Sequence, residues 1–225
     1  MPDMNSRRTI GRTVGILYIL GTVFGIVSAA VTGSVSGSDD VLASAASHES
    51  ALALGALLVV AMGIVLAMIP VVAYPILSEH DPLLARGYVL FRSVFESVAY
   101  LLTAIAWLTL TALGTEVPGV WGGTLFDLEG AAQVGTIAFL IGAAMFYSVL
   151  YRARLVPRWL SVWGLLAIVP YLVPVFLGLF SDIDVGTTST ATVLLDLPLG
   201  VQEMVLAVWL IVKGFGGGRS SRAGA

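Results

Sequence analysis

The stretch that most constrains this sequence is Gly87 to Leu113, an apolar run that nevertheless contains Arg92 and Glu96. A helix needs roughly 20 apolar residues to span the hydrocarbon core of a bilayer. A charged side chain at the centre of such a helix costs about 2.5–3.5 kcal/mol even on the most lenient insertion scale. An arginine and a glutamate one helical turn apart therefore need partners, and other helices of the same protein must supply them.

The composition places the whole chain in the membrane class. Hydrophobic residues make up 58% of its 225 positions and charged residues 11%, whereas a soluble domain has about 25% charged residues. We therefore expect an all-α, polytopic integral membrane helix bundle that forms a single domain over residues 1–215, with a disordered cytoplasmic tail at 216–225. Its six transmembrane helices are predicted at about 13–31, 51–77, 87–113, 131–150, 159–180 and 191–212.

Local signals refine the second span. Ser38 precedes two aspartates, a pattern typical of a helix N-cap with acids in the first turn. The segment VLASAASHESALALG is therefore predicted to be a short outer-face helix that merges into the second span without a break. Pro70 and Pro75 each remove an intrahelical hydrogen bond, which predicts a kink or an early end of that span.

The distribution of charge predicts the orientation. With the N-terminus inside and six spans, all eleven Lys and Arg residues fall in inner segments or, for Arg92, within the third span. The positive-inside rule then places both termini in the cytoplasm. The outer segments are conversely acidic, and carry Asp39, Asp40, Glu49, Glu116, Asp127, Glu129, Asp182 and Asp184.

Polar side chains within the spans converge at one depth. Counted from Arg86 along a straight helix, Arg92 lies about 9 Å and Glu96 about 15 Å into the bilayer, and Glu203 lies about 15 Å from Lys213 on the last span. Because Arg precedes Glu in the weaker of the two orientations at this spacing, we expect Arg92 to pair with Glu203 as well. The predicted ligand- or proton-binding residues are Arg92, Glu96, Glu203, Tyr100, Tyr88 and Asp196.

These residues support several functions. Two acids and one base leave a net charge of −1, so one carboxyl group is expected to be protonated or neutralised by a bound cation. The leading hypothesis is a cluster that binds a proton, a cation or a small polar ligand in a sensor, channel-like or transport role. The alternative without a ligand is a packing staple, a polar contact that only fixes how the third and last spans pack. An intramembrane enzyme acting on a lipid, with Glu96 or Glu203 as general base, and an accessory subunit for a larger partner are further alternatives. Asp196, nearer the outer surface, is more readily explained as a wetted helix end.

Other residue types narrow the options. The chain has no cysteine, and its two histidines, His48 and His80, are predicted on opposite faces, so neither a metal site nor a cofactor site is expected. No catalytic motif is present, and nucleic acid is not an expected partner. Two small-x3-small patterns in the first span, from Gly11 to Gly15 and from Gly21 to Gly25, favour internal packing over a dimer interface. A carrier with six spans would nevertheless require a homodimer.

Several stretches resemble one family. GILYILGTVFGIV, the VLASAASHESALALG segment, LFDLEG followed by the fourth span, YRARLVPRWLSVWGLLA and the closing QEMVLAVWLIVKG are similar to bacterial and archaeal membrane proteins known as domain of unknown function 4386. The positions of Arg92, Glu96 and Glu203 are also family-like, whereas Ala53 stands where a basic residue is frequent. The resemblance implies a multi-span helical fold in a prokaryotic cytoplasmic membrane, and it implies no particular activity.

Overall fold

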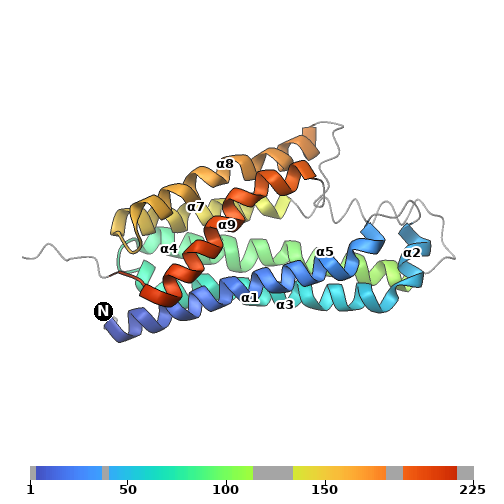
Figure 1. The fold of residues 1–225 in the computed structure, drawn as a ribbon, viewed down its shortest axis with the longest axis horizontal. Coiled ribbons are helices and arrows are strands. Elements are labelled where there is room, and N and C mark those ends of the chain that lie inside the picture. The colour runs from blue at the N-terminus through green and yellow to red at the C-terminus, as the bar shows by residue number, and fades with distance from the viewer. Residues whose placement is uncertain (1–3, 37–40, 114–133, 181–189, 217–225) are drawn as a thin grey trace, which may run out of the picture.

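The protein is a bundle of long helices, described by a computed structural model for residues 4–36, 41–113, 134–180 and 190–216 (Figure 1). In these ranges all regular secondary structure is helical. The elements are α1 (Met4–Ser36), α2 (Val41–Ser47), α3 (Glu49–Leu77), α4 (Pro82–Tyr88), the π-helix η1 (Val89–Phe95), α5 (Glu96–Leu113), α7 (Val134–Ala153), α8 (Arg158–Phe180) and α9 (Thr190–Lys213).

The predicted membrane architecture is confirmed. Within the described ranges, six helical segments are long and apolar enough to cross a bilayer: Met4–Gly33, Glu49–Leu77, Pro82–Leu113, Gly135–Ala153, Arg158–Gly178 and Thr190–Lys213. The first and third begin earlier than hydropathy predicts, because helix continues into polar residues at the membrane surface. The predicted start of the fourth span at 131, and the tail beyond 216, lie outside the described residues.

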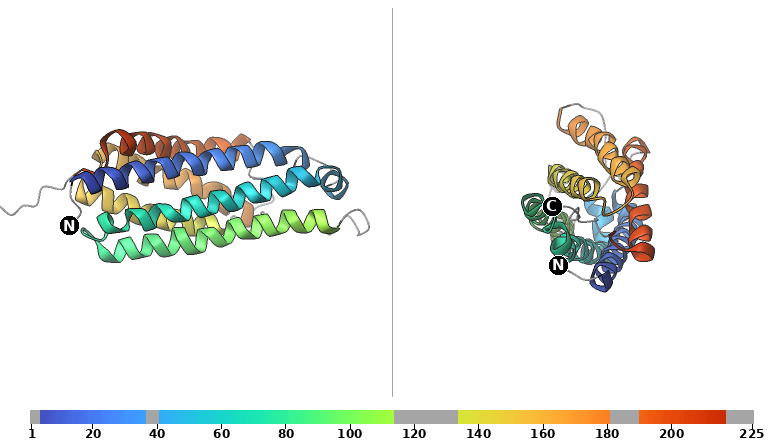
Figure 2. Two further views of the ribbon diagram at one scale, coloured as in Figure 1. Left: turned by 90° about the horizontal axis from the view of Figure 1, so that it is seen from below. Right: turned by 90° about the vertical axis from the view of Figure 1, so that its left-hand side faces the viewer.

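The helices pack side by side along the long axis of the molecule (Figures 1 and 2). Helix α1 packs against α3 and α9, and α3 also packs against α5. Helix α7 lies against α4, η1 and α8, and α8 in turn packs against α9. The third and last spans do not pack backbone against backbone; the side chains of Arg92 and Glu203 meet between them, inside neighbouring helices that supply the housing a buried charge requires.

The third span is one continuous rod made of α4, η1 and α5. It begins at Asp81, whose Oδ1 accepts a hydrogen bond from the backbone N–H of Leu84 at 3.0 Å, and Pro82 occupies the first helical position. Its middle is a π-helix, where a straight α-helix was expected. Gly142 of α7 packs closely against it there, because a Cβ on Gly142 would lie 3.3 Å from the Cβ of Phe91.

Two local expectations for the second span were wrong. The short helix α2 does precede it, but a turn at His48, with φ −125° and ψ 31°, separates α2 from α3. Of the two alternatives expected at Pro70 and Pro75, a kink or an early end, the early end is wrong, because α3 continues to Leu77. The hydroxyl of Ser93 donates to the carbonyl of Ala67 at 2.7 Å, in the turn before Pro70. Such side-chain bonds are one way in which membrane helices accommodate proline.

The glycine pattern of the first span serves internal packing, as predicted. A Cβ on Gly15 would lie 2.5 Å from the carbonyl oxygen of Ala207 in α9, and one on Gly21 would lie 2.5 Å from the side chain of Leu66 in α3. A Cβ on Gly11 would lie 2.8 Å from the Cα of Gly214. These glycines let α1 contact α9 and α3 through its backbone.

One end of the bundle gathers the basic residues, and we call it the basic end. There Arg7 of α1 forms an ion pair with Glu79, and Arg152 lies 3.8 Å from Asp81. After α9, the N–H of Gly216 donates to the carbonyl of Leu155 at 2.7 Å. These contacts bring the start of α1, the α3–α4 turn, the α7–α8 loop and the end of α9 together, as the orientation prediction requires.

Candidate functional site

Arg92 is the centre of the candidate site and is buried, with a side chain 2% exposed. Its Nη1 lies 3.7 Å from Oε2 of Glu96, and its Nη2 lies 3.8 Å from Oε1 of Glu203. The predicted pairing of one guanidinium with carboxylates of two helices is therefore present. Both separations are those of ion pairs and exceed the usual length of a direct hydrogen bond, about 2.7–3.2 Å.

Tyr100 is the third predicted residue that joins the cluster. Its hydroxyl donates to Oε1 of Glu96 at 2.7 Å, one helical turn further along α5. The other oxygen of Glu96, Oε2, is buried and makes no hydrogen bond with any described residue, and the same holds for Nε of Arg92. Glu96 is thus held on one side by a hydroxyl and on the other only by electrostatic attraction.

Aromatic rings surround the guanidinium. The Cζ atom of Arg92 lies 4.8 Å from the ring centre of Phe139 in α7 and 5.5 Å from that of Tyr18 in α1. A cation at such distances is attracted by the ring face, more so when water is excluded. Sequence reasoning missed both residues. A tyrosine inside an apolar span was an available signal for Tyr18, whereas Phe139 is indistinguishable from ordinary core residues.

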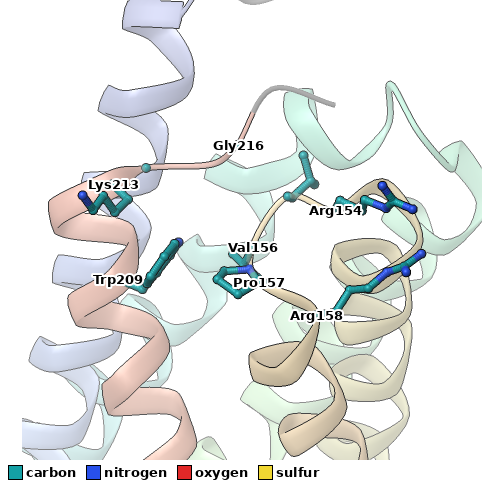
Figure 3. Close-up of a pocket in the computed structure, with 9 residues that line it drawn as sticks. Arg154, Val156, Pro157, Arg158, Trp209, Lys213 and Gly216 are labelled. Carbon is teal, nitrogen blue, oxygen red and sulfur yellow. The ribbon is translucent and has the colours of Figure 1, made fainter. Parts of the chain in front are cut away.

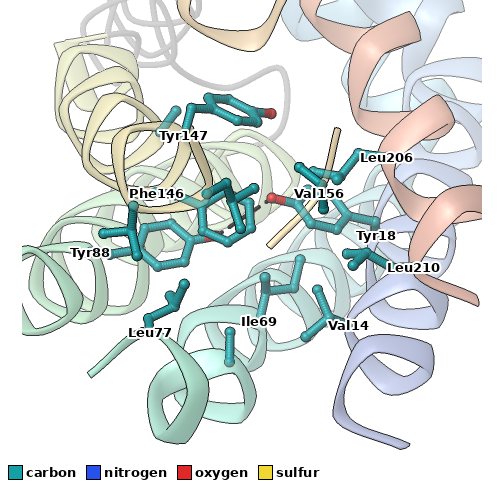
Figure 4. Packing of buried hydrophobic residues seen from close by; sticks show 14 of the residues in the cluster. Val14, Tyr18, Ile69, Leu77, Tyr88, Phe146, Tyr147, Val156, Leu206 and Leu210 are labelled. Atoms are coloured by element: carbon teal, nitrogen blue, oxygen red, sulfur yellow. Dashed lines mark hydrogen bonds between the residues drawn. The ribbon is translucent and has the colours of Figure 1, made fainter. Parts of the chain in front are cut away.

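Tyr88 belongs to the aromatic layer beside the cluster and makes no described bond to Arg92. Its ring stacks on Phe146 with centres 4.7 Å apart. Its hydroxyl lies 3.5 Å from that of Tyr18, as Figure 4 shows within the buried core. Close by, Tyr147 donates to Oε1 of Gln202 at 2.6 Å, and Nε2 of Gln202 donates to the Leu160 carbonyl at 3.0 Å. These two bonds join α7, α8 and α9.

Asp196 is not brought into the cluster by any contact within the described part of the chain. It lies in α9 two turns before Glu203, and one of its oxygens, Oδ1, is buried without a hydrogen bond. Its assignment as a ligand-binding residue remains a prediction. The geometry therefore unites Arg92, Glu96, Glu203 and Tyr100, and places Tyr88 one layer away.

The chemistry available to the cluster follows from its charges. One guanidinium faces two carboxylates, and only Glu203 has appreciable exposure, with 16% of its side chain accessible. A full charge in such surroundings is costly unless it is paired. The cluster therefore holds two acidic groups and one basic group, and Glu203 is its most accessible member.

Comparison with known proteins identifies the family of this chain. The sequence model of a family described as a domain of unknown function (DUF4386) matches residues 13–214. The chain belongs to this family. No curated protein and no solved structure matches the sequence. The match to DUF4386 covers all six candidate spans apart from the start of the first, and so includes every residue of the Arg92 cluster.

Proposed function

We propose that this DUF4386 protein binds a proton at the Arg92, Glu96 and Glu203 cluster, and uses that proton in a sensor, channel-like or transport role without catalysing a reaction. The observation that carries the proposal is the buried guanidinium shared by two carboxylates from different helices. With both carboxyl groups ionised the cluster has an excess negative charge. A proton on one of them leaves a neutral pair and a neutral acid.

A proton explains the geometry better than a metal cation or a small polar molecule. Hard cations take about six or more oxygen ligands in proteins, and Arg92 would repel a cation placed between the two carboxylates. A polar molecule would need space, but Phe139 and Tyr18 pack on the guanidinium and Tyr100 occupies one oxygen of Glu96. A proton needs no additional volume.

Glu203 is the carboxyl group that we assign to proton exchange. It is more exposed than Glu96, and its only described charged partner is Arg92. Glu96 has Arg92 and the Tyr100 hydroxyl as partners, which favour its ionised form. In this division of roles Glu96 stays paired with Arg92, while Glu203 takes up and releases the proton.

The test is an infrared titration of the purified protein in lipid nanodiscs. The carbonyl stretch of a protonated carboxylic acid is separated from carboxylate bands, so one buried protonated Glu gives its own signal. We expect a pH-dependent band in the parent protein that Glu203→Gln removes. Glu49→Gln makes the same change at an exposed residue of α3 and should retain the band.

Two results would count against a proton site. The first is a band in this region that persists in Glu203→Gln, which would remove Glu203 from its assigned role. The second is a parent protein with no pH-dependent band, while Glu203→Gln and Arg92→Ala lose thermal stability to a similar extent. That outcome would identify the cluster as a packing staple.

The alternative of an intramembrane enzyme requires a water-filled cavity that reaches both carboxyl groups. A pocket of about 230 Å³ lies between α3 and α5, but its lining includes Ser97 and Tyr100 and neither carboxylate. The pocket at the basic end is likewise lined by other residues. No observation on the described residues favours the enzyme over the proton site.

A further inference from the structure

A second polar site lies at the basic end of the bundle, and none of its lining residues belongs to the Arg92 cluster. A pocket of about 360 Å³ opens where the α7–α8 loop meets the end of α9. Figure 3 shows Lys213 and Trp209 on one side of the loop that contains Val156 and Pro157, and Arg154 and Arg158 on its other side. The full lining is Arg154, Leu155, Val156, Pro157, Arg158, Trp209, Lys213, Gly214 and Gly216.

The charge of this pocket is of one sign. Three of the nine lining residues are cations and none is acidic. None of the three has a described ion-pair partner, whereas the neighbouring Arg152 pairs with Asp81. The only described aromatic contact among them places Arg158 over the ring of Tyr151, with Cζ 5.1 Å from the ring centre. The pocket therefore suits an anion with several acceptor oxygens.

The backbone around the pocket is fixed. Gly214 ends α9 with φ +72°, and its N–H donates to the Leu210 carbonyl at 2.9 Å. The adjoining Phe215 is buried, and Gly216 is bonded to Leu155. These contacts tie the end of α9 to the loop, so the backbone of Lys213 and that of the two loop arginines are held on either side of one concave surface. Figure 3 shows the charged ends of these exposed side chains pointing outward from it.

The depth of the pocket identifies the kind of anion. It lies where the span of α9 ends at Lys213 and the span of α8 begins at Arg158. Trp209 is a residue type that is enriched at headgroup level. Towards this end both helices expose apolar side chains, namely Trp159, Val162 and Leu166 on α8 and Val208 and Val212 on α9. A soluble anion would gain nothing from these side chains, whereas acyl chains would cover them.

We propose that this pocket binds the phosphate headgroup of an anionic phospholipid, and that the exposed side chains of Lys213, Arg154 and Arg158 turn inward from the orientations in Figure 3 to reach it. The acyl chains of that lipid lie along the exposed apolar faces of α8 and α9. Basic pockets between membrane helices hold anionic lipid headgroups in this way. The site is separate from the proton site, and neither proposal depends on the other.

Native mass spectrometry of the protein released from nanodiscs tests this assignment. The probe is phosphatidylglycerol, titrated into phosphatidylcholine nanodiscs, and the readout is the number of retained anionic lipids at each mole fraction. We expect Lys213→Gln and Arg154→Gln each to weaken retention about fivefold, the usual effect of one cation near a membrane surface. Arg86→Gln removes an exposed cation of the basic end that does not line the pocket, and should change retention little.

A parallel arm separates a lipid from a soluble anion. Inorganic phosphate is added to the protein in pure phosphatidylcholine nanodiscs, and thermal unfolding is followed by tryptophan fluorescence. We expect phosphatidylglycerol to raise the unfolding midpoint and inorganic phosphate to leave it unchanged. A midpoint raised equally by phosphate would overturn the lipid assignment. Equal loss of lipid retention in Arg86→Gln would also overturn it, because the effect would then be one of general surface charge.

Discussion

Arg92 is buried among aromatic rings and reaches carboxylates on α5 and α9 from its place in η1. A polar contact between membrane helices contributes on average about 0.6 kcal/mol and at most about 1.7 kcal/mol in measured cases. Structural gain on that scale is small compared with the cost of placing three ionisable groups in the membrane. This imbalance is the residue-scale reason to assign the cluster a role beyond packing.

His80 provides a residue-scale prediction outside the membrane spans. It lies in the turn between α3 and α4, where partial burial and then the nearby Arg7 guanidinium lower its pKa below 6.5, against an opposing effect of Glu79. Folding therefore favours the neutral imidazole. The stability that this contributes is complete above the unfolded pKa and is lost as the pH falls through the lower folded pKa.

We accordingly expect His80→Gln to lose less stability than the parent protein between about pH 8 and pH 5. The measurement is the thermal unfolding midpoint across that range in one detergent. His48→Gln, at the opposite end of the bundle, makes the same chemical change away from Arg7 and Glu79 and serves as the control. A steeper slope in His80→Gln would show that the sign of this argument is wrong.

At the scale of elements, the contact between α1 and α9 depends on glycine. We predict that Gly15→Ala destabilises the protein by about 1–3 kcal/mol, the usual cost of overpacking. The added Cβ would lie 2.5 Å from the backbone oxygen of Ala207, so the helices would have to move apart. The measurement is the free energy of unfolding in a denaturing detergent titration.

Gly200→Ala is the matched control for this prediction. Gly200 lies in α9, the helix that Gly15 contacts, and a Cβ there meets nothing within 4 Å. The control should therefore be neutral, or slightly stabilising because alanine favours helix over glycine. Equal effects of the two substitutions would show that the α1–α9 contact is looser than described.

Most elements could be predicted because hydropathy and length determine a membrane span almost without tertiary context. The Arg92–Glu203 pair could also be predicted from the sequence, because few other charged residues lie within the spans at a depth where they could pair with Arg92. The turn at His48 and the π-helix were not predictable in the same way. The turn and the π-helix each depend on which carbonyl oxygen a backbone N–H bonds to, and the spacing of apolar side chains in the sequence does not determine that partner.

At the scale of the whole molecule, the basic end is a set of interlocked segments. Arg7 links α1 to the α3–α4 turn, Arg152 links α7 to Asp81, and Gly216 links the end of α9 to the α7–α8 loop. Basic residues separated widely in the sequence thus lie at one end, which the positive-inside rule assigns to the cytoplasm. The aromatic contacts of Arg92 were less predictable, because they depend on how α1 and α7 close around the third span.

Single-cysteine labelling tests the orientation directly, because the chain contains no cysteine. Ser50→Cys places a thiol on an exposed residue at the start of α3, and Leu83→Cys places one on a residue 77% exposed at the basic end. With an impermeant maleimide on intact cells, we expect labelling of Ser50→Cys and labelling of Leu83→Cys only after permeabilisation. The reverse pattern would invert the assigned topology, and the cysteine-free parent sets the background.

The π-helix at Val89–Phe95 is a wider turn in the third span, and its conversion to α-helix would rotate the rest of the span about the helix axis. Each residue that a wider turn accommodates corresponds to about 100° of rotation when the turn tightens to α-helix. Conversion of even one residue would therefore rotate Glu96 and everything after it about the helix axis relative to Tyr88. The span would need neither to unfold nor to tilt, so a change of protonation at Glu203, which pairs with Arg92 in η1, could be transmitted to the far end of α5 as torsion.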